Sequence, residues 1–249
     1  EAIKTQFHHL VRTVPASGRL LVNATDAALK QVLDRGCWSE RESFAGDGQW
    51  QAIPQQPDCS RFDVLFEGET LGHVQWQLIG EHNMNNALAA IAASRHAGVS
   101  PIDAIRALND FRNAKRRLEV SFRQNGITIY DDFAHHPTAI KTTLAGLRAK
   151  VGSEKIIAVL EPRSNTMKLG VHKEALVNAL SAADSVYCFE TDDINWSIQE
   201  LFDEQGKEVD ISNDIEALCN KLACSAQHND HILIMSNGGF GNIHQKLLA

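Results

Sequence analysis

The stretch Tyr130–Pro137, which reads YDDFAHHP, decides the fold of this chain. It ends an apolar run, Gly126–Tyr130, whose β-branched and aromatic residues after an Asn-Gly turn signal are typical of a strand. Pro137 suits the first position of a helix, because its missing N–H needs no partner there. Strand, polar turn and helix form the unit with which α/β proteins bind ligands beyond the carboxyl ends of their strands. We therefore expect the carboxylates and histidines of this stretch to lie on the turn and face a ligand.

The bulk properties of the chain are those of an ordinary globular protein. It has 249 residues, of which 43% are hydrophobic and 22% charged, and this suits two modest domains better than one large domain. The formal charge of −7 argues against a sequence-independent nucleic-acid surface, and the densest basic run, Lys115–Arg117, is too short to supply one. The sequence has no apolar run of about 18 residues. Neither nucleic acid nor a membrane is therefore expected as a partner.

The cysteines indicate a reducing environment. Their number is odd, and none forms a Cys-x-x-Cys pair or a Cys/His spacing typical of zinc sites. We therefore expect reduced thiols in a cytoplasmic protein. The five residues are Cys37, Cys59, Cys188, Cys219 and Cys224.

The second half of the chain alternates strands with helices. Predicted strands cover residues 118–123, 127–130, 155–160, 185–189 and 231–236, and residues 209–211 form a short apolar segment. Predicted helices between and after them cover residues 137–150, 171–182, 198–202, 215–226 and 240–248. This alternation predicts an α/β fold with a doubly wound, mainly parallel, Rossmann-like sheet in a domain of residues 113–249.

The first half, residues 1–112, is predicted to be a mixed α/β domain. A helix ends before Pro15, a short strand covers Arg19–Asn23, and a loop-rich region with several glycines and prolines follows. Residues 62–66 and 71–78 then resemble two antiparallel strands. Two helices close this half, one after the stretch GEHNMNN (residues 80–86) and one at Pro101.

Two asparagines in the stretch GEHNMNN are candidate ligand-binding residues. Asn83 could simply cap the following helix by accepting a backbone N–H of its first turn. Asn86 is harder to explain structurally, because it lies one turn into the helix, where asparagine is a poor helix former. A side-chain amide offers both a donor and an acceptor, which the edge of an adenine requires. His82, just before them, is better explained as an oriented histidine than as a metal ligand.

Three more candidates come from the YDDFAHHP unit and the approach to it. Arg117 could bind the phosphate or ribose of a nucleotide with its planar fork, or pair with a surface carboxylate. Asp132 could accept from both ribose hydroxyls, or stabilise the start of the helix at Pro137. His135 and His136 could bind a metal ion. Adjacent histidines seldom face the same way, however, and the sequence shows no other group of residues that could complete a metal site with them. We therefore expect no metal site in this chain.

Two further predicted strand ends carry polar clusters. Residues 156–160 lead into EPRSN, where Pro162 stops the strand and Arg163 becomes available for a substrate carboxylate. The last strand leads into SNGGFG at Ser236–Gly241. Glycines at such a turn let backbone N–H groups approach an anion at a helix N-terminus. One glycine turn is weak evidence, but three strand-end clusters in one sheet favour a ligand site.

Together these motifs resemble the Mur ligases, which use ATP to build the peptide of bacterial peptidoglycan. GEHNMNN, KRRLE at Lys115–Glu119 and YDDFAHHPT resemble the nucleotide-side signature of that family. EPRSNTMK at Glu161–Lys168 and MSNGGFGNIHQKLL at Met235–Leu248 resemble one branch in particular. That branch reattaches the recycled murein tripeptide, L-Ala-γ-D-Glu-meso-diaminopimelate, to UDP-N-acetylmuramate. The resemblance covers essentially the whole chain.

The resemblance implies a mechanism and a set of site residues. ATP would phosphorylate the muramoyl carboxylate, the tripeptide amine would attack the acyl phosphate, and the tetrahedral intermediate would collapse to an amide, ADP and phosphate. The residues implied to bind ATP are Asn83, Asn86, Arg117, Asp132 and His135. The residues implied to face the tripeptide are Arg163, Asn165, Asn237, Gly238 and Gly239. No residue is assigned as catalytic.

One departure from the family is large. A full Mur ligase has an amino-terminal domain for the UDP-sugar and a GxxGK[ST] loop, whereas this sequence contains no Gly-Lys-Ser or Gly-Lys-Thr. The loop lysine and hydroxyl normally hold the β- and γ-phosphates and Mg²⁺, whose other ligands in the family would also lie upstream. We therefore expect residues 1–112 to be the carboxy-terminal portion of a central ATP-binding domain, and residues 113–249 the carboxy-terminal domain. We expect such a fragment to be unable to turn over ATP by itself.

Three alternatives stay open. The chain could be a non-catalytic module that binds adenine or a peptide. It could belong to the branch that adds L-alanine to UDP-N-acetylmuramate, which shares the DD…HHP turn but has a different arginine-rich segment in place of EPRSNTMK. It could also be a relative of folylpolyglutamate synthase, which EPRSNTMK and the SNGGFG turn disfavour.

Overall fold

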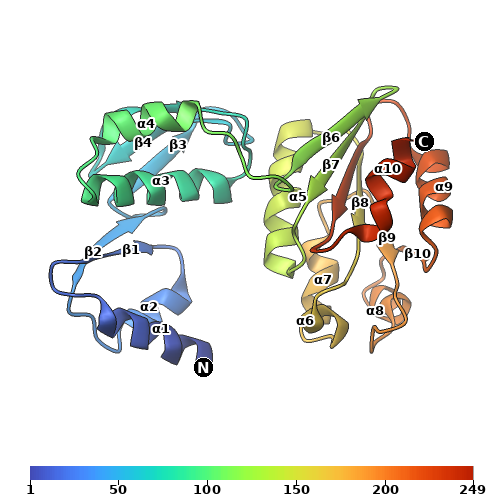
Figure 1. Ribbon diagram of the computed structural model, residues 1–249, viewed down its shortest axis with the longest axis horizontal. Coiled ribbons are helices and arrows are strands. Elements are labelled where there is room, and N and C mark those ends of the chain that lie inside the picture. Colours follow the sequence, from blue (N-terminus) through green and yellow to red (C-terminus); the bar gives the residue numbers. More distant parts are fainter. Residues whose placement is uncertain (249) are drawn as a thin grey trace. The chain divides into compact units, whose positions relative to one another are not determined.

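The computed structural model describes residues 1–248 and divides at Arg112 into two compact units (Figure 1). We call Glu1–Arg112 the amino-terminal unit and the part from Asn113 onward the carboxy-terminal unit. Each unit has its own sheet and its own hydrophobic core. The two are therefore described separately.

The amino-terminal unit contains a five-stranded mixed sheet in the order β1-β2-β3-β4-β5. The strands are β1 (Arg19–Asn23), β2 (Glu40–Phe44), β3 (Trp50–Pro54), β4 (Arg61–Phe66) and β5 (Glu69–Gln75). The first three pair in parallel and the last two pairings are antiparallel. The helices are α1 (Ala2–Thr13), α2 (Ala27–Leu33), α3 (Glu81–His96) and α4 (Pro101–Asn109). Trp50, Phe62, Leu88 and Ile91 are fully buried between sheet and helices.

The predicted loop-rich region of this unit is in fact largely regular, because it contains α2, β2 and β3. The sequence of β2, ERESF, has no apolar alternation to mark it as a strand. Its one buried position is Glu42, a charged residue. A strand that buries a carboxylate does not show the hydrophobic period on which strand prediction depends.

The carboxy-terminal unit contains a six-stranded sheet in the order β10-β9-β8-β11-β7-β6. The strands are β6 (Glu119–Gln124), β7 (Ile127–Asp132), β8 (Ile156–Leu160), β9 (Ser185–Phe189), β10 (Asp210–Ser212) and β11 (His231–Met235). All neighbours pair in parallel except β6, which forms an antiparallel hairpin with β7. The predicted doubly wound, mainly parallel sheet is confirmed.

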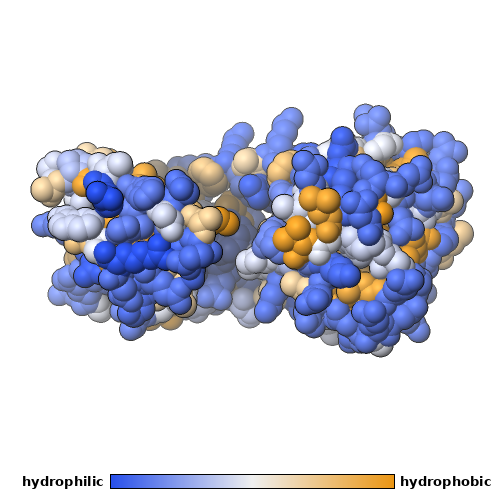
Figure 2. Space-filling view, turned by 90° about the horizontal axis from the view of Figure 1, so that it is seen from below, coloured by the Kyte–Doolittle hydropathy of each residue, from blue (hydrophilic) through white to orange (hydrophobic). Residues whose placement is uncertain are grey.

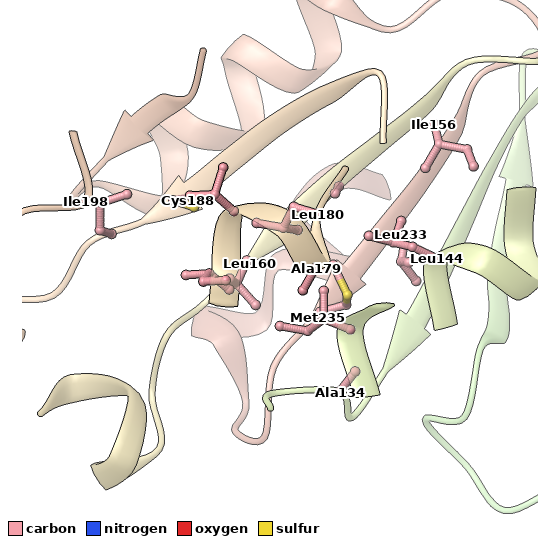
Figure 3. Close-up of a cluster of buried hydrophobic side chains, with 14 of the residues drawn as sticks. Ala134, Leu144, Ile156, Leu160, Ala179, Leu180, Cys188, Ile198, Leu233 and Met235 are labelled. Atoms are coloured by element: carbon pink, nitrogen blue, oxygen red, sulfur yellow. The ribbon is translucent and has the colours of Figure 1, made fainter. Parts of the chain in front are cut away.

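Helices of this unit pack on both faces of the sheet. They are α5 (Pro137–Val151), α6 (Asn165–Lys168), α7 (Lys173–Ala179), α8 (Ile198–Glu204), α9 (Ile215–Ser225), the 3₁₀ turn η1 (Phe240–Asn242) and α10 (Ile243–Leu248). One core joins α5, α7 and α8 to the sheet through residues such as Leu144, Leu160 and Met235 (Figure 3). A second core on the other face joins α9 and α10 to the strands through Leu218 and Ile243.

Two helices of this unit differ from their prediction. The helix expected over residues 171–182 is shorter, and the separate helix α6 precedes it. The closing helix is interrupted at Gly241, whose φ of 53° lies in the left-handed region that glycine tolerates. Both differences lie where the chain leaves a strand end and turns toward a helix.

The pairing register brings three strand ends together. Met235 at the end of β11 pairs with Asp132 of β7 on one side and with Leu160 of β8 on the other. The segments that follow β8 and β11 therefore leave the sheet beside the end of β7. This edge is where an α/β sheet binds ligands.

The visible surface of each unit is mostly hydrophilic, with hydrophobic residues in small separate groups (Figure 2). Among residues 1–248, no helix combines the length and the apolar character that crossing a lipid bilayer would need.

Candidate functional site

Backbone hydrogen bonds join the three strand ends of the carboxy-terminal unit. The N–H of Ser236 donates to the carbonyl of Asp132 at 3.1 Å, and the N–H of Glu161 donates to the carbonyl of Met235 at 3.1 Å. The polar clusters predicted from the sequence therefore lie at one edge of one sheet. This convergence makes the edge the candidate site of this unit.

Asp132 lies at the end of strand β7 and not on the turn, and its carboxylate is already engaged. The side chain is 4% exposed, Oδ2 accepts the N–H of Leu118 at 2.6 Å, and Oδ1 accepts the N–H of Ala134 at 2.7 Å. Burial raises the pKa of Asp132, although these two hydrogen bonds and the charge of Arg117 oppose the rise. The residue that caps α5 is His136, whose Nδ1 accepts the N–H of Thr138 at 3.3 Å.

The two histidines of the turn contact different neighbours. His135 Nδ1 lies 2.9 Å from the carbonyl oxygen of Phe133, and its ring meets the Phe133 ring edge-on at 5.5 Å. The His136 ring instead meets that of His172 at 4.6 Å. Burial lowers the pKa of His136, and the charges of His172 and His135 lower it further. Within residues 1–248 no group of three or more potential ligands could hold a metal ion.

Of the two adjacent arginines, Arg116 is the one bound into the strand-end network. Its Nη2 donates to the carbonyl of Ser236 at 2.6 Å, Nε lies 3.2 Å from an Asp131 oxygen, and Cζ lies 5.3 Å from the centre of the Phe133 ring. Arg117, the predicted residue, is exposed, and its guanidinium has no hydrogen-bond or ion-pair partner among the described residues, although its charge acts on Asp132. Sequence reasoning missed Arg116, because two neighbouring arginines in a loop carry no signal that separates their roles.

Asp131, which was expected on the turn, lies within strand β7, and neither it nor His244 was assigned a specific role from the sequence. Asp131 Oδ1 lies 3.4 Å from His244 Nε2 of α10. Burial by itself would raise the pKa of Asp131, but the hydrogen bond and charge of His244, together with Arg116, bring the pKa below its usual value. The place of His244 within the motif MSNGGFGNIHQKLL was the signal that could have found it.

The candidate peptide-binding residues surround the ends of β8 and β11. Arg163 is exposed, and no acceptor within residues 1–248 pairs with its guanidinium. The side chain lies against the bare Cα of Gly238, since a Cβ built there would come within 2.6 Å of Arg163 Cδ and Cζ. Asn165 is exposed at the start of α6, and Gly239 is exposed beside open space. Asn237 Oδ1 is buried with no donor among the described residues.

Beneath this turn lies a buried pair that sequence reasoning also missed. Ser236 is 1% exposed and Glu161 is 6% exposed. The Ser236 hydroxyl donates to Glu161 Oε2, and Ser236 Oγ accepts the N–H of Gly238 at 2.9 Å. The two side chains therefore join the end of β8 to the glycine turn after β11.

Asn83 and Asn86 belong to helix α3 of the amino-terminal unit. Gly80 is the N-cap of this helix and makes no side-chain cap. The capping role considered for Asn83 is therefore wrong, because its amide donates to the carbonyl of Ile79 at 2.8 Å. Asn86 is exposed, and its side-chain amide has no partner among residues 1–248. Its donor and its acceptor are both available to a ligand.

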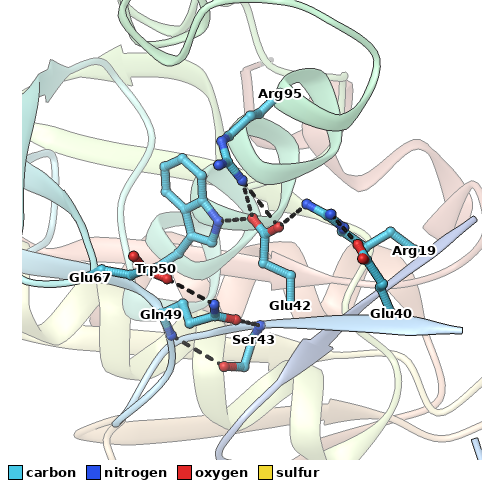
Figure 4. A network of polar contacts seen from close by, with 8 residues as sticks. All are labelled: Arg19, Glu40, Glu42, Ser43, Gln49, Trp50, Glu67 and Arg95. Carbon is cyan, nitrogen blue, oxygen red and sulfur yellow. Dashed lines mark hydrogen bonds and ion pairs between the residues drawn. The ribbon is translucent and has the colours of Figure 1, made fainter.

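The amino-terminal unit also contains a polar cluster around Glu42 (Figure 4). This carboxylate is 4% exposed and lies 2.6 Å from Arg19 Nη1 and 3.3 Å from Arg95 Nη1. Trp50 Nε1 donates to its other oxygen, and the Arg95 guanidinium lies 4.5 Å from the centre of the Phe66 ring. The cluster satisfies a buried charge on β2, and this explains how the strand tolerates it.

Comparison with known protein families gives two matches along the chain. Residues 1–94 match the Mur ligase middle domain. Residues 116–238 match the Mur ligase glutamate ligase domain. The two matches fall in the amino-terminal and carboxy-terminal units respectively.

Individual relatives agree with these matches. The chain is 53% identical over all 249 residues to UDP-N-acetylmuramate–L-alanyl-γ-D-glutamyl-meso-2,6-diaminoheptandioate ligase of Escherichia coli, covering 54% of that protein. It is 47% identical over its full length to the protein of the same name from Haemophilus influenzae, covering 55% of it. The crystal structure of a murein peptide ligase from Psychrobacter arcticus superposes with a TM-score of 0.74 and 38% identity, over 99% of this chain and 54% of that one. The chain spans about half the length of the curated relatives that it matches.

Proposed function

The chain belongs to the Mur ligase family, and from that premise we propose that it forms part of an ATP-dependent ligase that joins UDP-N-acetylmuramate to L-Ala-γ-D-Glu-meso-diaminopimelate. The relatives from Escherichia coli and Haemophilus influenzae carry the name of this activity, and they align with all 249 residues of the chain at 53% and 47% identity. The observation that carries the proposal is the convergence of three polar strand ends beside an unpaired guanidinium, that of Arg163.

The proposed reaction makes an amide in two steps. The muramoyl carboxylate takes the γ-phosphoryl group of ATP and becomes an acyl phosphate, and ADP leaves. The tripeptide amine then attacks the acyl carbon, and the tetrahedral intermediate expels phosphate as the C–N bond is completed and the amine loses its proton. The part that we assign to this chain is to bind and orient the tripeptide and the nucleotide.

On the peptide side we propose Arg163, Asn165, Asn237, Gly238 and Gly239 as binding residues. A guanidinium without a protein partner is suited to a carboxylate, which it can bind through two parallel N–H donors. The buried oxygen of Asn237 lacks a donor, and a buried acceptor left unpaired is costly unless a ligand or water supplies one. A peptide substrate carries both carboxylate and amine groups. Its carboxylate can therefore pair with the Arg163 guanidinium, and an N–H group can donate to the Asn237 oxygen.

On the nucleotide side we propose Asn83, Asn86, Arg117, Asp132 and His135. The free amide of Asn86 suits an adenine edge, with Asn83 one turn before it. Arg117 is free to bind phosphate or ribose, since Arg116 takes the structural contacts. Each oxygen of Asp132 keeps a lone pair for a ribose hydroxyl, but its main contribution is to fix the backbone beside Arg117 and His135.

The described residues do not fit a Mg²⁺ site of their own, because none of them form a group of three or more potential ligands. We therefore derive no step of the reaction through the metal. The sequence also lacks a Gly-Lys-Ser or Gly-Lys-Thr tripeptide. We propose that the 249-residue chain by itself does not release phosphate from ATP, which a malachite-green assay measures. The five cysteines are free, in keeping with our proposal of a cytoplasmic enzyme.

Titration calorimetry tests the peptide side. We expect the chain to bind L-Ala-γ-D-Glu-meso-diaminopimelate and not L-alanine, and Arg163→Ala to abolish measurable binding. Arg123→Ala is the matched control. Arg123 is also exposed, but it lies on β6 opposite Thr128, near the start of β7, whereas the candidate site lies at the end of β7. Binding of L-alanine in place of the tripeptide would show that the chain belongs to the branch that adds L-alanine. Tripeptide binding unchanged in Arg163→Ala would remove Arg163 from the pocket.

A fluorescent ATP analogue tests the nucleotide side. We expect Asn86→Ala to weaken its binding and to reduce the preference for ATP over GTP as competitor, because the amide offers the donor and acceptor that the adenine edge needs and alanine offers neither. Asn85→Ala is the matched control, since Asn85 is the neighbouring helix residue and has no proposed role. An equal loss in both variants would contradict a specific role for Asn86.

A further inference from the structure

Glu161 is buried, and it is not among the residues that we propose to bind the peptide or the nucleotide. It is 6% exposed, and it takes part in none of the ion pairs found among residues 1–248. A buried carboxyl group is costly unless it is hydrogen-bonded, so its partner is of interest. The contact that Glu161 makes is with the hydroxyl of Ser236.

The direction of this contact matters for the turn. The Ser236 hydroxyl donates its hydrogen to Glu161 Oε2. The lone pairs of Ser236 Oγ are then directed elsewhere, and they accept the N–H of Gly238 at 2.9 Å. Because Ser236 is 1% exposed, its hydroxyl has no access to bulk water that would compete for either bond.

The turn held in this way supports Arg163. The guanidinium and Cδ of Arg163 occupy the space that a Cβ of Gly238 would fill. Glu161 also accepts the backbone N–H of Arg163 on its carbonyl oxygen at 2.9 Å. Glu161 is therefore connected to Arg163 in two ways. One is the backbone hydrogen bond after β8, and the other is the chain of contacts through Ser236 and Gly238 after β11.

We propose that Glu161 and Ser236 are positioning residues that set the specificity of the peptide pocket. They hold Gly238 in place, and the side chain of Arg163 packs against Gly238 in the orientation in which its guanidinium binds a substrate carboxylate. This proposal rests on the proposed function, in which Arg163 binds the tripeptide. The two residues act through Arg163 and need not touch the peptide.

A double-mutant cycle on the 249-residue chain tests the proposal, with tripeptide affinity measured by calorimetry. Ser236→Ala removes both hydrogen bonds of the Glu161–Ser236–Gly238 relay, and it is expected to weaken binding about tenfold. In the Arg163→Lys background, which keeps the positive charge but lacks the planar guanidinium, Ser236→Ala is expected to weaken the remaining binding by much less. Equal losses in the presence and absence of the arginine would overturn the proposal and leave the proposed function intact.

Two further measurements separate positioning from a general loss of structure. Ser225→Ala removes a hydroxyl that accepts from Tyr187 at 3.0 Å in the same unit, and it is expected to leave tripeptide affinity unchanged. If wild-type chain does not bind the tripeptide, the proposed function fails and this proposal with it. If Arg163→Ala loses binding while Ser236→Ala keeps it, only the relay is refuted.

Substitutions in the glycine turn keep the test valid should Ser236→Ala fail to fold. Gly238→Ala puts a methyl group where Arg163 lies, so the Nε–H resonance of Arg163 in an NMR spectrum is expected to shift and the affinity to fall by about the same factor as in Ser236→Ala. Gly239→Ala, whose Cβ would meet nothing within 4 Å, is expected to leave that resonance in place. Equal shifts of the Arg163 resonance in both variants, or no shift in Gly238→Ala, would contradict the proposal that Arg163 packs against Gly238.

Discussion

Asp132 Oδ2 accepts a hydrogen bond from the backbone N–H of Leu118 at 2.6 Å. This bond joins the last residue of β7 to the residue that follows Arg117. The other oxygen of the same carboxylate accepts the N–H of Ala134, at the start of the turn that carries His135, at 2.7 Å. One buried carboxylate thus fixes the backbone beside two residues that we propose to bind nucleotide.

The first prediction concerns the number of acceptors at this position. Asn has one side-chain oxygen and an NH₂ group, so Asp132→Asn leaves the N–H of Leu118 or of Ala134 facing another donor. We expect the free energy of unfolding to fall by about 1–3 kcal/mol, the penalty for one buried unpaired group. Urea denaturation measures the change. Asp192→Asn is the control, because Asp192 is exposed in the same unit. An equal effect in the two variants would show that the two bonds of Asp132 contribute nothing.

The second prediction concerns pH and the neighbouring carboxylate, Asp131. Its pKa lies below the usual value because His244 and Arg116 outweigh the effect of burial. A depressed folded-state pKa means that the stabilisation is fully present above the unfolded pKa, ordinarily near ~3.9, and is lost as the pH falls through the folded value. Asp132 has the opposite sign, because burial raises its pKa. Its ionisation therefore reduces stability as the pH rises from the unfolded pKa to the folded one.

Urea denaturation between about pH 3 and pH 7 separates the two carboxylates. Asp131→Asn is expected to be less stable than wild type at neutral pH and to approach wild type in acid. Asp132→Asn lacks a group that binds protons more tightly in the folded state, so its deficit is expected to grow toward acid. Parallel stability curves for wild type and Asp131→Asn across this range would contradict the assignment to Asp131.

The third prediction separates Arg116 from Arg117. Arg116→Ala removes the contacts to Asp131 and to the carbonyl of Ser236, so we expect a loss of about 1.5–3 kcal/mol in the free energy of unfolding, as for hydrogen bonds to a charged group. Arg117→Ala removes a side chain without a partner among the described residues, so stability is expected to stay within about 0.5 kcal/mol while nucleotide binding weakens. The opposite pattern in the two variants would show that the adjacent arginines exchange these roles.

The fourth prediction concerns the cluster around Glu42 in the amino-terminal unit. Glu42→Gln removes the charge that Arg19 and Arg95 share, and we expect a loss of about 1.5–3 kcal/mol because those bonds are charge-assisted and largely buried. Glu40→Gln is the matched control, since Glu40 pairs with the same Arg19 but its side chain is 70% exposed. Its loss is expected to stay below about 1 kcal/mol, as for surface ion pairs. Equal losses in thermal or urea unfolding would mean that burial of Glu42 is not what matters.

Much of the fold could be predicted because its signals are local. The strand at Ile127, the proline that begins α5 and the alternation of strands and helices in the second half each arise from neighbouring residues. Prediction failed at β2, where Glu42 occupies a core position through ion pairs with Arg19 and Arg95. Arg95 is 53 residues away in the sequence, so no local window contains the reason that the carboxylate is buried.

The candidate site could be predicted only as three separate clusters. The sequence by itself determined that polar residues follow the apolar runs that end at Tyr130, Leu160 and Met235, because strands and turns are encoded by consecutive residues. Only the tertiary structure decided that β11 lies between β8 and β7, since this order depends on cores packed on both faces of the sheet. That order places Ser236 on Glu161, 75 residues away, and Gly238 beneath Arg163. A hydrogen bond between residues so far apart exists only once the strands between them are placed, and the roles of single side chains follow from that placement.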